Sequence, residues 1–265
     1  MPTRKSPTVA EGAPRRCEGN GSHRSPRRLV LLGALPALLA GGPARAQLEV
    51  LLRGVPPAEP KAGACGLYRF EASEPDGERQ VDFHVCIESV QPGASGRVML
   101  RLWSGDSLET RVEVSRALFS GGGGALLEHV RRVVQIEHGE KREMDAEEWQ
   151  ELPALSPAPE LPVVADSTWG PVQHQGTGLS CRGHYRVEAR ESKQRLGETE
   201  VVQAERRTLE VLTAPQAPIL GVVRATAAVS SERRFSQPIP GVPQRGPRLS
   251  HYRLELLALE SPGRR

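Results

Sequence analysis

Alternation of apolar and polar residues is the feature that most restricts the fold of this chain. Apolar residues fill every second position of segment 81–87, and the same period of two returns at 98–102, 185–189 and 252–256. Side chains that alternate in this way point to opposite faces of a β-strand, so each segment predicts a strand with one buried and one solvated face. With few amphipathic helices between them, the strands predict a mainly β fold built on a curved antiparallel sheet.

The first hairpin has the clearest signal. Residues 67–72 and 79–90 read as two strands, and the turn Glu74–Gly77 lies between them. A turn of this composition, with Asp-Gly at its end, joins antiparallel neighbours. It predicts that Ser73 faces Glu78 across the hairpin.

Counting back from that pair places Cys65 opposite Cys86. Opposed residues in an antiparallel pair have Cβ atoms about 4.5–5.5 Å apart, close to the reach of a disulfide. We therefore predict a Cys65–Cys86 disulfide. The alternative pairs Cys181 with one of these two cysteines; otherwise Cys181 is a buried, unpaired thiol.

The amino-terminal region is typical of a secretion leader. An arginine pair, Arg27-Arg28, precedes an uncharged run of 14 residues at 29–42, and Ala44-Arg45-Ala46 follows. A basic region, a short apolar region and an A-x-A site together indicate a signal peptide, here residues 1–46. A membrane-spanning helix needs about 20 apolar residues, so we expect no transmembrane segment after cleavage and a periplasmic or extracellular location. The sequence leaves open the general or twin-arginine export route and the true start codon.

The charge of the chain changes when this leader is set aside. Residues 1–46 hold eight basic and two acidic side chains, which leaves 27 basic and 30 acidic residues in the remainder. A chain with this slight acidic excess has no electrostatic reason to bind nucleic acid.

The sequence predicts one β-rich domain after the leader. We expect a linker at 47–64 and a domain at 65–260, in two halves that a proline-rich crossing at 153–163 connects. The oligomeric state is not indicated.

No motif for catalysis, metal binding or cofactor binding stands out. The seven histidines are not in metal-ligand spacing, and the glycine run 121–124 lacks the Lys-Ser/Thr of a phosphate-binding loop. We therefore expect a non-enzymatic protein without a cofactor or metal. The tryptophans Trp103, Trp149 and Trp169 are large apolar anchors, for which core packing is the first expectation and ligand lining the second.

Two segments resemble a known group of proteins. Residues 176–181, Gly-Thr-Gly-Leu-Ser-Cys, lead into a strand, and residues 213–224 run from one strand through prolines into another. Over residues 67–230 this resembles uncharacterised exported bacterial proteins similar to the lipoprotein-localisation-factor fold, although the tryptophan usual before the proline segment is missing. The resemblance implies a half-barrel whose apolar concave face is covered by a few short helices.

The resemblance also implies a function, by analogy of fold. It suggests an exported envelope protein that binds a lipid or lipid-linked partner, such as a lipoprotein, in an apolar groove. One alternative is a structural or interaction module of the envelope without a small ligand. The other is a secreted hydrolase whose site is assembled from distant residues.

Removal of the leader is directly testable. Expression of the full chain in a Gram-negative host should give exported protein that begins at Gln47, as measured by intact mass and amino-terminal sequencing. Ala46→Arg should block cleavage, because the peptidase requires a small residue there. Intact chains that keep Met1 and stay in the cytoplasm would contradict the leader.

Overall fold

The computed structural model describes residues 51–52, 58–75, 77–93, 95–105, 108–119, 129–144, 161–197, 199–237 and 246–261. All of them belong to one compact unit, Gly33–Arg265. The predicted signal peptide 1–46, Trp149, the glycine run 121–124 and most of the proline-rich crossing lie outside the described residues.

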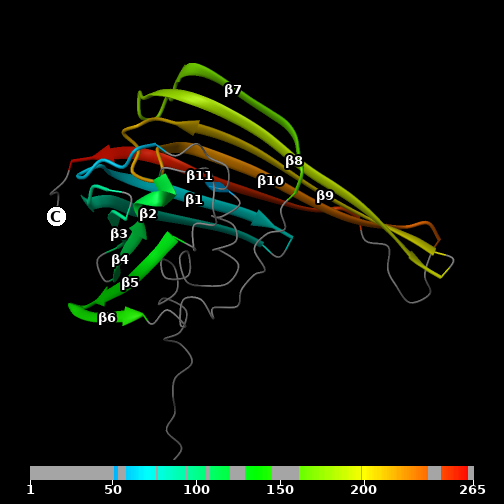
Figure 1. Cartoon of the computed structure of the whole chain (residues 1–265), viewed down its shortest axis with the longest axis horizontal. Helices are drawn as coiled ribbons and strands as arrows, with labels where there is room; N and C mark the ends of the chain where they lie inside the picture. Colours follow the sequence, from blue (N-terminus) through cyan, green and yellow to red (C-terminus); the bar gives the residue numbers. More distant parts are fainter. Residues whose placement is uncertain are drawn as a thin grey trace, which may run out of the picture. The chain divides into compact units, whose positions relative to one another are not determined.

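Eleven strands form one antiparallel sheet, and the strands bend along their length (Figure 1). In chain order the strands are β1 (Cys65–Glu74), β2 (Gly77–Val90), β3 (Arg97–Ser104), β4 (Leu108–Ser115), β5 (Val130–Glu137), β6 (Glu140–Met144), β7 (Val163–Gln173), β8 (Ser180–Leu196), β9 (Thr199–Thr213), β10 (Val222–Phe235) and β11 (Arg248–Glu260).

The strand order across the sheet is β6-β5-β4-β3-β2-β1-β11-β10-β9-β8-β7. Strands β1 to β6 follow one another as neighbours, and so do β7 to β11. The two series meet where β1 pairs with β11, and β6 and β7 are the two edges of the described sheet. The sheet is therefore open.

The predicted fold class is confirmed at the level of a mainly β, antiparallel sheet. Helix is scarcer than expected: the described residues contain almost none apart from short pieces such as the 3-10 helix η2 (Arg116–Phe119). No described helix has the length and apolar character needed to cross a membrane.

Several strand limits differ from the sequence-based expectation. Within the segment 213–224, β10 begins only at Val222, because residues 218–221 form a turn in which Leu220 and Gly221 have φ of 50° and 78°. Strand β7 was not predicted at all. All of its residues are exposed, so its sequence shows no alternation between buried and solvated positions.

The apolar side chains of the central strands cover one face of the sheet. Tyr68, Val85, Leu254 and Leu256 are fully buried there, and Leu118 and Phe119 of η2 pack in the same core cluster. Burial of such side chains contributes about 1.5–3 kcal/mol each, so this face supplies most of the stability of the domain.

Tyr68 connects this core to the turn before β10. Its hydroxyl donates to the carbonyl oxygen of Val222 (2.9 Å) and accepts from the amide of Ile219 (3.4 Å). Burial raises the pKa of Tyr68 above its ordinary value, so the hydroxyl stays protonated and can donate.

Described parts of the region expected to be a linker contact the sheet. Leu51 and Leu52 are buried in the core cluster. The amide of Ala58 donates to the carbonyl oxygen of Leu220 (3.1 Å), and that of Gly63 donates to Ile87 (2.7 Å). These residues therefore add to the apolar side of the domain.

The first hairpin has the predicted register. Ser73 pairs with Glu78 and Cys65 with Cys86, although the turn is tighter than expected because Glu74 already pairs with Gly77. The Cys65–Cys86 disulfide is confirmed, with Cα atoms 4.1 Å apart. Cys181 is free and buried, and burial raises the pKa of its thiol.

Removal of the disulfide should destabilise the domain. It closes a loop with a sequence separation of 21 residues. Replacing Cys65 and Cys86 together by alanine should therefore lower the free energy of unfolding by about 2–4 kcal/mol in urea titrations. The control, Cys181→Ala, removes a thiol without a crosslink and should cost about 1 kcal/mol. Equal losses in the two proteins would show that the crosslink does not stabilise the fold.

Candidate binding site: a polar groove on the sheet

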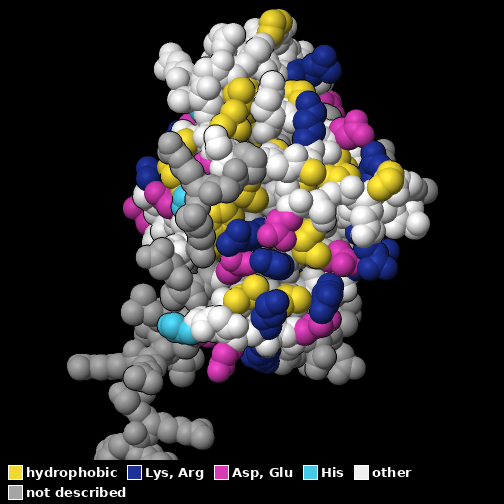
Figure 2. Space-filling model, turned by 90° about the vertical axis from the view of Figure 1, so that its left-hand side faces the viewer, with side chains coloured by type: hydrophobic (Ala, Val, Ile, Leu, Met, Phe, Trp, Pro, Cys, Tyr) yellow, Lys and Arg dark blue, Asp and Glu magenta, His cyan; other side chains and the backbone are white. Residues whose placement is uncertain are grey.

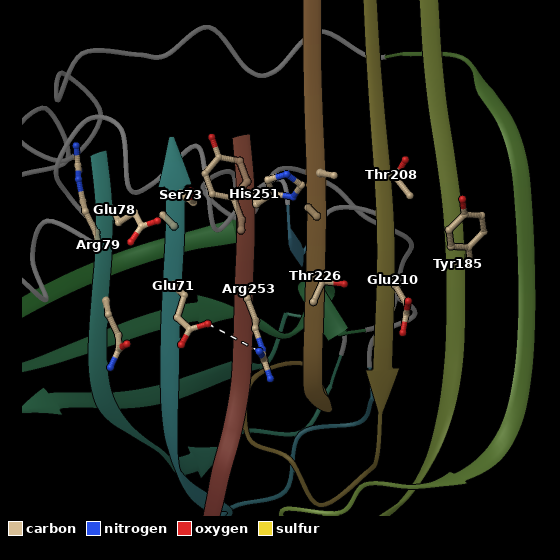
Figure 3. A pocket seen from close by; sticks show the side chains of 15 residues that line it. Glu71, Ser73, Glu78, Arg79, Tyr185, Thr208, Glu210, Thr226, His251 and Arg253 are labelled. Carbon is tan, nitrogen blue, oxygen red and sulfur yellow. Dashed lines mark ion pairs between the residues drawn. The ribbon is translucent and has the colours of Figure 1, made fainter. Parts of the chain in front are cut away.

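The face of the sheet opposite the apolar core carries a groove of about 700 Å³ (Figure 3). We call this side the polar face. Six neighbouring strands, β2, β1, β11, β10, β9 and β8, contribute to the lining. Figure 3 labels these residues of the groove lining: Glu71, Ser73, Glu78, Arg79, Tyr185, Thr208, Glu210, Thr226, His251 and Arg253.

Strand register explains why these residues meet. Across the sheet, Glu71 pairs with Arg253, Arg253 with Thr226, Thr226 with Glu210, and Glu210 with Tyr185. Directly opposed residues in antiparallel strands point to the same face, so one row of polar side chains crosses five strands. Their sequence neighbours, such as Leu254 and Ala225, point to the core.

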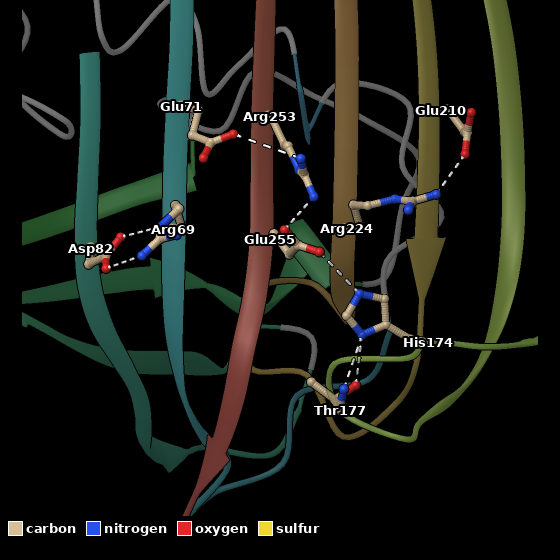
Figure 4. A network of polar contacts seen from close by, with 9 residues as sticks. All are labelled: Arg69, Glu71, Asp82, His174, Thr177, Glu210, Arg224, Arg253 and Glu255. Carbon is tan, nitrogen blue, oxygen red and sulfur yellow. Dashed lines mark hydrogen bonds and ion pairs between the residues drawn. The ribbon is translucent and has the colours of Figure 1, made fainter.

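Ion pairs hold the charged side chains of the groove floor in place (Figure 4). Arg253 donates to Glu255 (2.6 Å) and lies 3.9 Å from Glu71, while Arg224 donates to Glu210 (3.0 Å). Each of these pairs is partly exposed, so its net stabilisation is small, up to about 1 kcal/mol. Their main effect is to fix the directions in which carboxylates and guanidinium groups face a ligand.

The same network continues below the groove. Arg69 donates two hydrogen bonds of 2.8 Å to Asp82, and these bonds lower the pKa of Asp82. Figure 2 shows acidic and basic side chains interspersed over one side of the molecule, in agreement with the many cross-strand ion pairs.

A turn from the edge of the sheet reaches this network. His174 follows β7, yet its Nε2 lies 3.4 Å from Glu255 of β11, four strands away in the sheet order. Its Nδ1 lies 3.0 Å from the hydroxyl of Thr177, and the ring is only 6% exposed. The hairpin turn between β7 and β8 therefore lies over the polar face beside the groove, as Figure 4 shows.

Trp103 lies on the polar face but outside the groove. Its indole stacks on His84, with ring centroids 4.9 Å apart, and the guanidinium of Arg101 lies 5.0 Å from the indole centroid. Arg101 also donates to Glu109 (2.6 Å). Burial would raise the pKa of Glu109, but hydrogen bonds from Arg101 and Arg111 outweigh it and lower that pKa.

Trp169 lies on the edge strand β7 and also does not line the groove. It pairs with Gly183 of β8, and a Cβ atom added at Gly183 would overlap the indole ring. Gly183 therefore provides the space in which Trp169 packs against the sheet. The ligand-lining role suggested for Trp103, Trp149 and Trp169 stays a prediction, and neither of the two described tryptophans is part of the groove lining.

Sequence reasoning missed the groove residues for a clear reason. Alternation alone places Glu71, Arg253 and Glu210 on solvated strand faces and gives no sign of a binding site. These residues meet because β1 pairs with β11, a strand far away in the sequence. No local pattern in the sequence indicates that pairing.

The groove is suited to hydrogen bonding with a polar ligand. Its labelled lining offers hydroxyl groups, an imidazole, carboxylates and guanidinium groups on a rigid sheet. Within the described ranges, no group of three or more His, Cys, Asp or Glu side chains is arranged to hold a metal ion.

Comparison with known proteins adds little to this geometry. No protein-family model matches the sequence, and no curated protein matches it. One solved structure that matches comes from Bacteroides fragilis and is described as exported, with a YmcC-like fold; it shares 11% identity, covers 77% of this chain and 99% of its own, and has a TM-score of 0.22. Another, from Parabacteroides distasonis, is described as a lipoprotein, with 11% identity, coverage of 76% and 97%, and a TM-score of 0.17.

At these TM-scores neither similarity supports a conclusion about fold or function. The similarity to the lipoprotein-localisation-factor fold is not confirmed by any of the comparisons.

The packing of Trp169 on Gly183 can be tested by a single methyl group. Gly183→Ala should displace the indole, shift tryptophan fluorescence to longer wavelength and cost about 1–3 kcal/mol of stability. Gly246→Ala is the control, because a Cβ there meets open space; it should change stability by less than about 0.5 kcal/mol. An unchanged emission spectrum in Gly183→Ala would contradict the packing.

Proposed function

We propose that this protein is an exported, non-enzymatic binding protein of the bacterial cell envelope, with a ligand site in the polar groove. The observation that carries the proposal is the groove itself. It lies over six strands, and three of its charged side chains, Glu71, Glu210 and Arg253, form ion pairs within or between the strands. Concave sites of this size, in which a few polar groups are held in fixed directions, are typical of ligand binding.

Export is supported by two independent features. Residues 27–46 have the charge, apolar run and small residues of a cleavable leader. The Cys65–Cys86 disulfide is of a kind that persists in oxidising compartments and is rare in the bacterial cytosol.

The chemistry of the groove favours a polar ligand. An acyl chain needs an apolar cavity, but the apolar face of the described sheet is packed by its own core, which includes Leu51, Phe119 and Leu220. The lining also mixes both charge signs, with Glu71, Glu210 and Arg253 among its members. We therefore infer a neutral or zwitterionic ligand, or the polar part of a lipid-linked partner, in place of a buried lipid chain.

The non-enzymatic part of the proposal rests on how the groove residues are engaged. Glu210 is bound by Arg224, and Glu71 lies beside Arg253. Ser73 and His251 oppose each other across β1 and β11, but both are exposed, and no hydrogen bond joins them in the described part of the chain. In a catalytic serine site, a base within hydrogen-bond reach activates the hydroxyl group.

Binding can be measured with two probe classes on the processed protein. The polar class is a panel of oligosaccharides, dipeptides and phosphocholine, followed by thermal shift and calorimetry; the apolar class is the fluorescent fatty acid cis-parinaric acid. We expect a polar compound to bind. Thr226→Trp, which fills the centre of the groove, should weaken that binding at least about ten-fold.

The matched control is Thr199→Trp, because Thr199 is a half-buried strand threonine that does not line the groove. It should bind like the wild type. Uptake of cis-parinaric acid that Thr226→Trp does not change would favour the apolar-groove hypothesis. Absence of binding by both classes would favour the interaction module, and ester turnover that Ser73→Ala abolishes would revive the hydrolase.

A further inference from the structure

The two edges of the sheet differ in a way that points to a partner. Edge strand β6 is five residues long, and four of them are charged, Glu140, Lys141, Arg142 and Glu143. Edge strand β7 has 11 residues, all of them exposed. It carries four of the six exposed large hydrophobic residues of the described chain: Val163, Val164, Trp169 and Val172.

An edge strand presents unpaired amide and carbonyl groups that can pair with another strand. Charged side chains on a short edge are a common protection against such pairing, and β6 has both features. Strand β7 has neither, and its residues 165–169 pair regularly with β8, between two register shifts and before Pro171. Its only charged residue, Asp166, is already bound by His184 of the same chain, at 2.7 Å.

We propose that β7 is a dimerisation edge, where two copies of this chain pair β7 antiparallel with β7 across a twofold axis. A second copy is the occupant that matches the edge in length and in apolar character. Pairing with β6 of another copy would place four charged residues against an apolar strand that is twice as long. The β7–β7 interface is isologous, so it closes as a dimer and leaves only protected β6 edges exposed.

The sequence of β7 selects the position of the axis. A twofold axis perpendicular to the sheet leaves each residue on the same face in the second copy. Directly opposed residues also share a face, so at the axis one residue of β7 lies opposite the same residue of the second copy. At Asp166 it would oppose two carboxylates. At Ser167 it opposes Asp166 to Thr168 and the small Ala165 to the large Trp169, so we place the axis there.

The dimer would also join the two polar faces. Ser167 pairs with Tyr185, which lines the groove, and the row of polar residues therefore continues across the axis into the second copy. The inference goes beyond the proposed function, since it does not depend on which ligand the groove binds.

One added strand pair buries less area than a standard stable interface of about 1,600 Å². We therefore expect a concentration-dependent dimer with a Kd on the order of micromolar, about 8 kcal/mol of binding free energy.

Sedimentation velocity of the processed protein over a range of concentrations tests the dimer. Val164→Lys places a charge on the edge and should raise the Kd at least ten-fold. Leu249→Lys is the matched control: Leu249 is an exposed large apolar residue on β11, which has neighbours on both sides, and the Kd should not change. A protein that is monomeric at all concentrations, or a dimer that Val164→Lys leaves intact, would overturn the proposal.

A crosslink tests the axis. In a Cys181→Ala background, Ser167→Cys should form a reducible covalent dimer. The axis places position 167 of one copy opposite position 167 of the other, so the two new thiols face each other. Ser250→Cys, on a central strand, should stay uncrosslinked. If Val164→Lys disrupts the dimer but Ser167→Cys does not crosslink, the β7 edge is upheld and the proposed register is wrong.

Discussion

The antiparallel pairing of β1 with β11 is the contact on which the rest of the structure depends. It joins the series β1 to β6 to the series β7 to β11 in one sheet. On one face it brings Tyr68 and Phe70 beside Leu254 and Leu256, all almost fully buried. On the other face it opposes Glu71 to Arg253. Core and groove therefore share one origin, because the same register places both sets of side chains.

Because of this pairing, one face of the sheet carries the apolar core and the other carries the polar groove. Residues from outside the central strands, among them Leu51, Phe119 and Leu220, pack on the apolar face. Burial of this face therefore stabilises the domain. Over the groove on the polar face, the described part of the chain provides no such cover. The side chains of this face instead hold one another through ion pairs of modest energy, which suits a surface that must stay in water and keep its geometry.

The Cys65–Cys86 disulfide lies next to the pairing of β1 with β11. Cys65 and Cys86 oppose each other at the start of β1, beside the junction with β11, where Cys65 also pairs with Glu260. The bond restricts the unfolded chain around a hairpin that takes part in the central junction. A sheet whose key pairing joins strands far apart in sequence forms slowly and benefits from local contacts that are already in place.

Sequence alone determined the local structure. Alternation fixed the strands whose two faces differ, such as 81–87 and 252–256, and the count from one turn fixed the Cys65–Cys86 pair, because register within a hairpin is a local property. The order of strands, the groove and the edge strand β7 were decided only by the tertiary structure. Glu71 and Arg253 meet through a pairing between distant segments, which no local pattern indicates. Every residue of β7 is exposed, so its sequence shows no alternation.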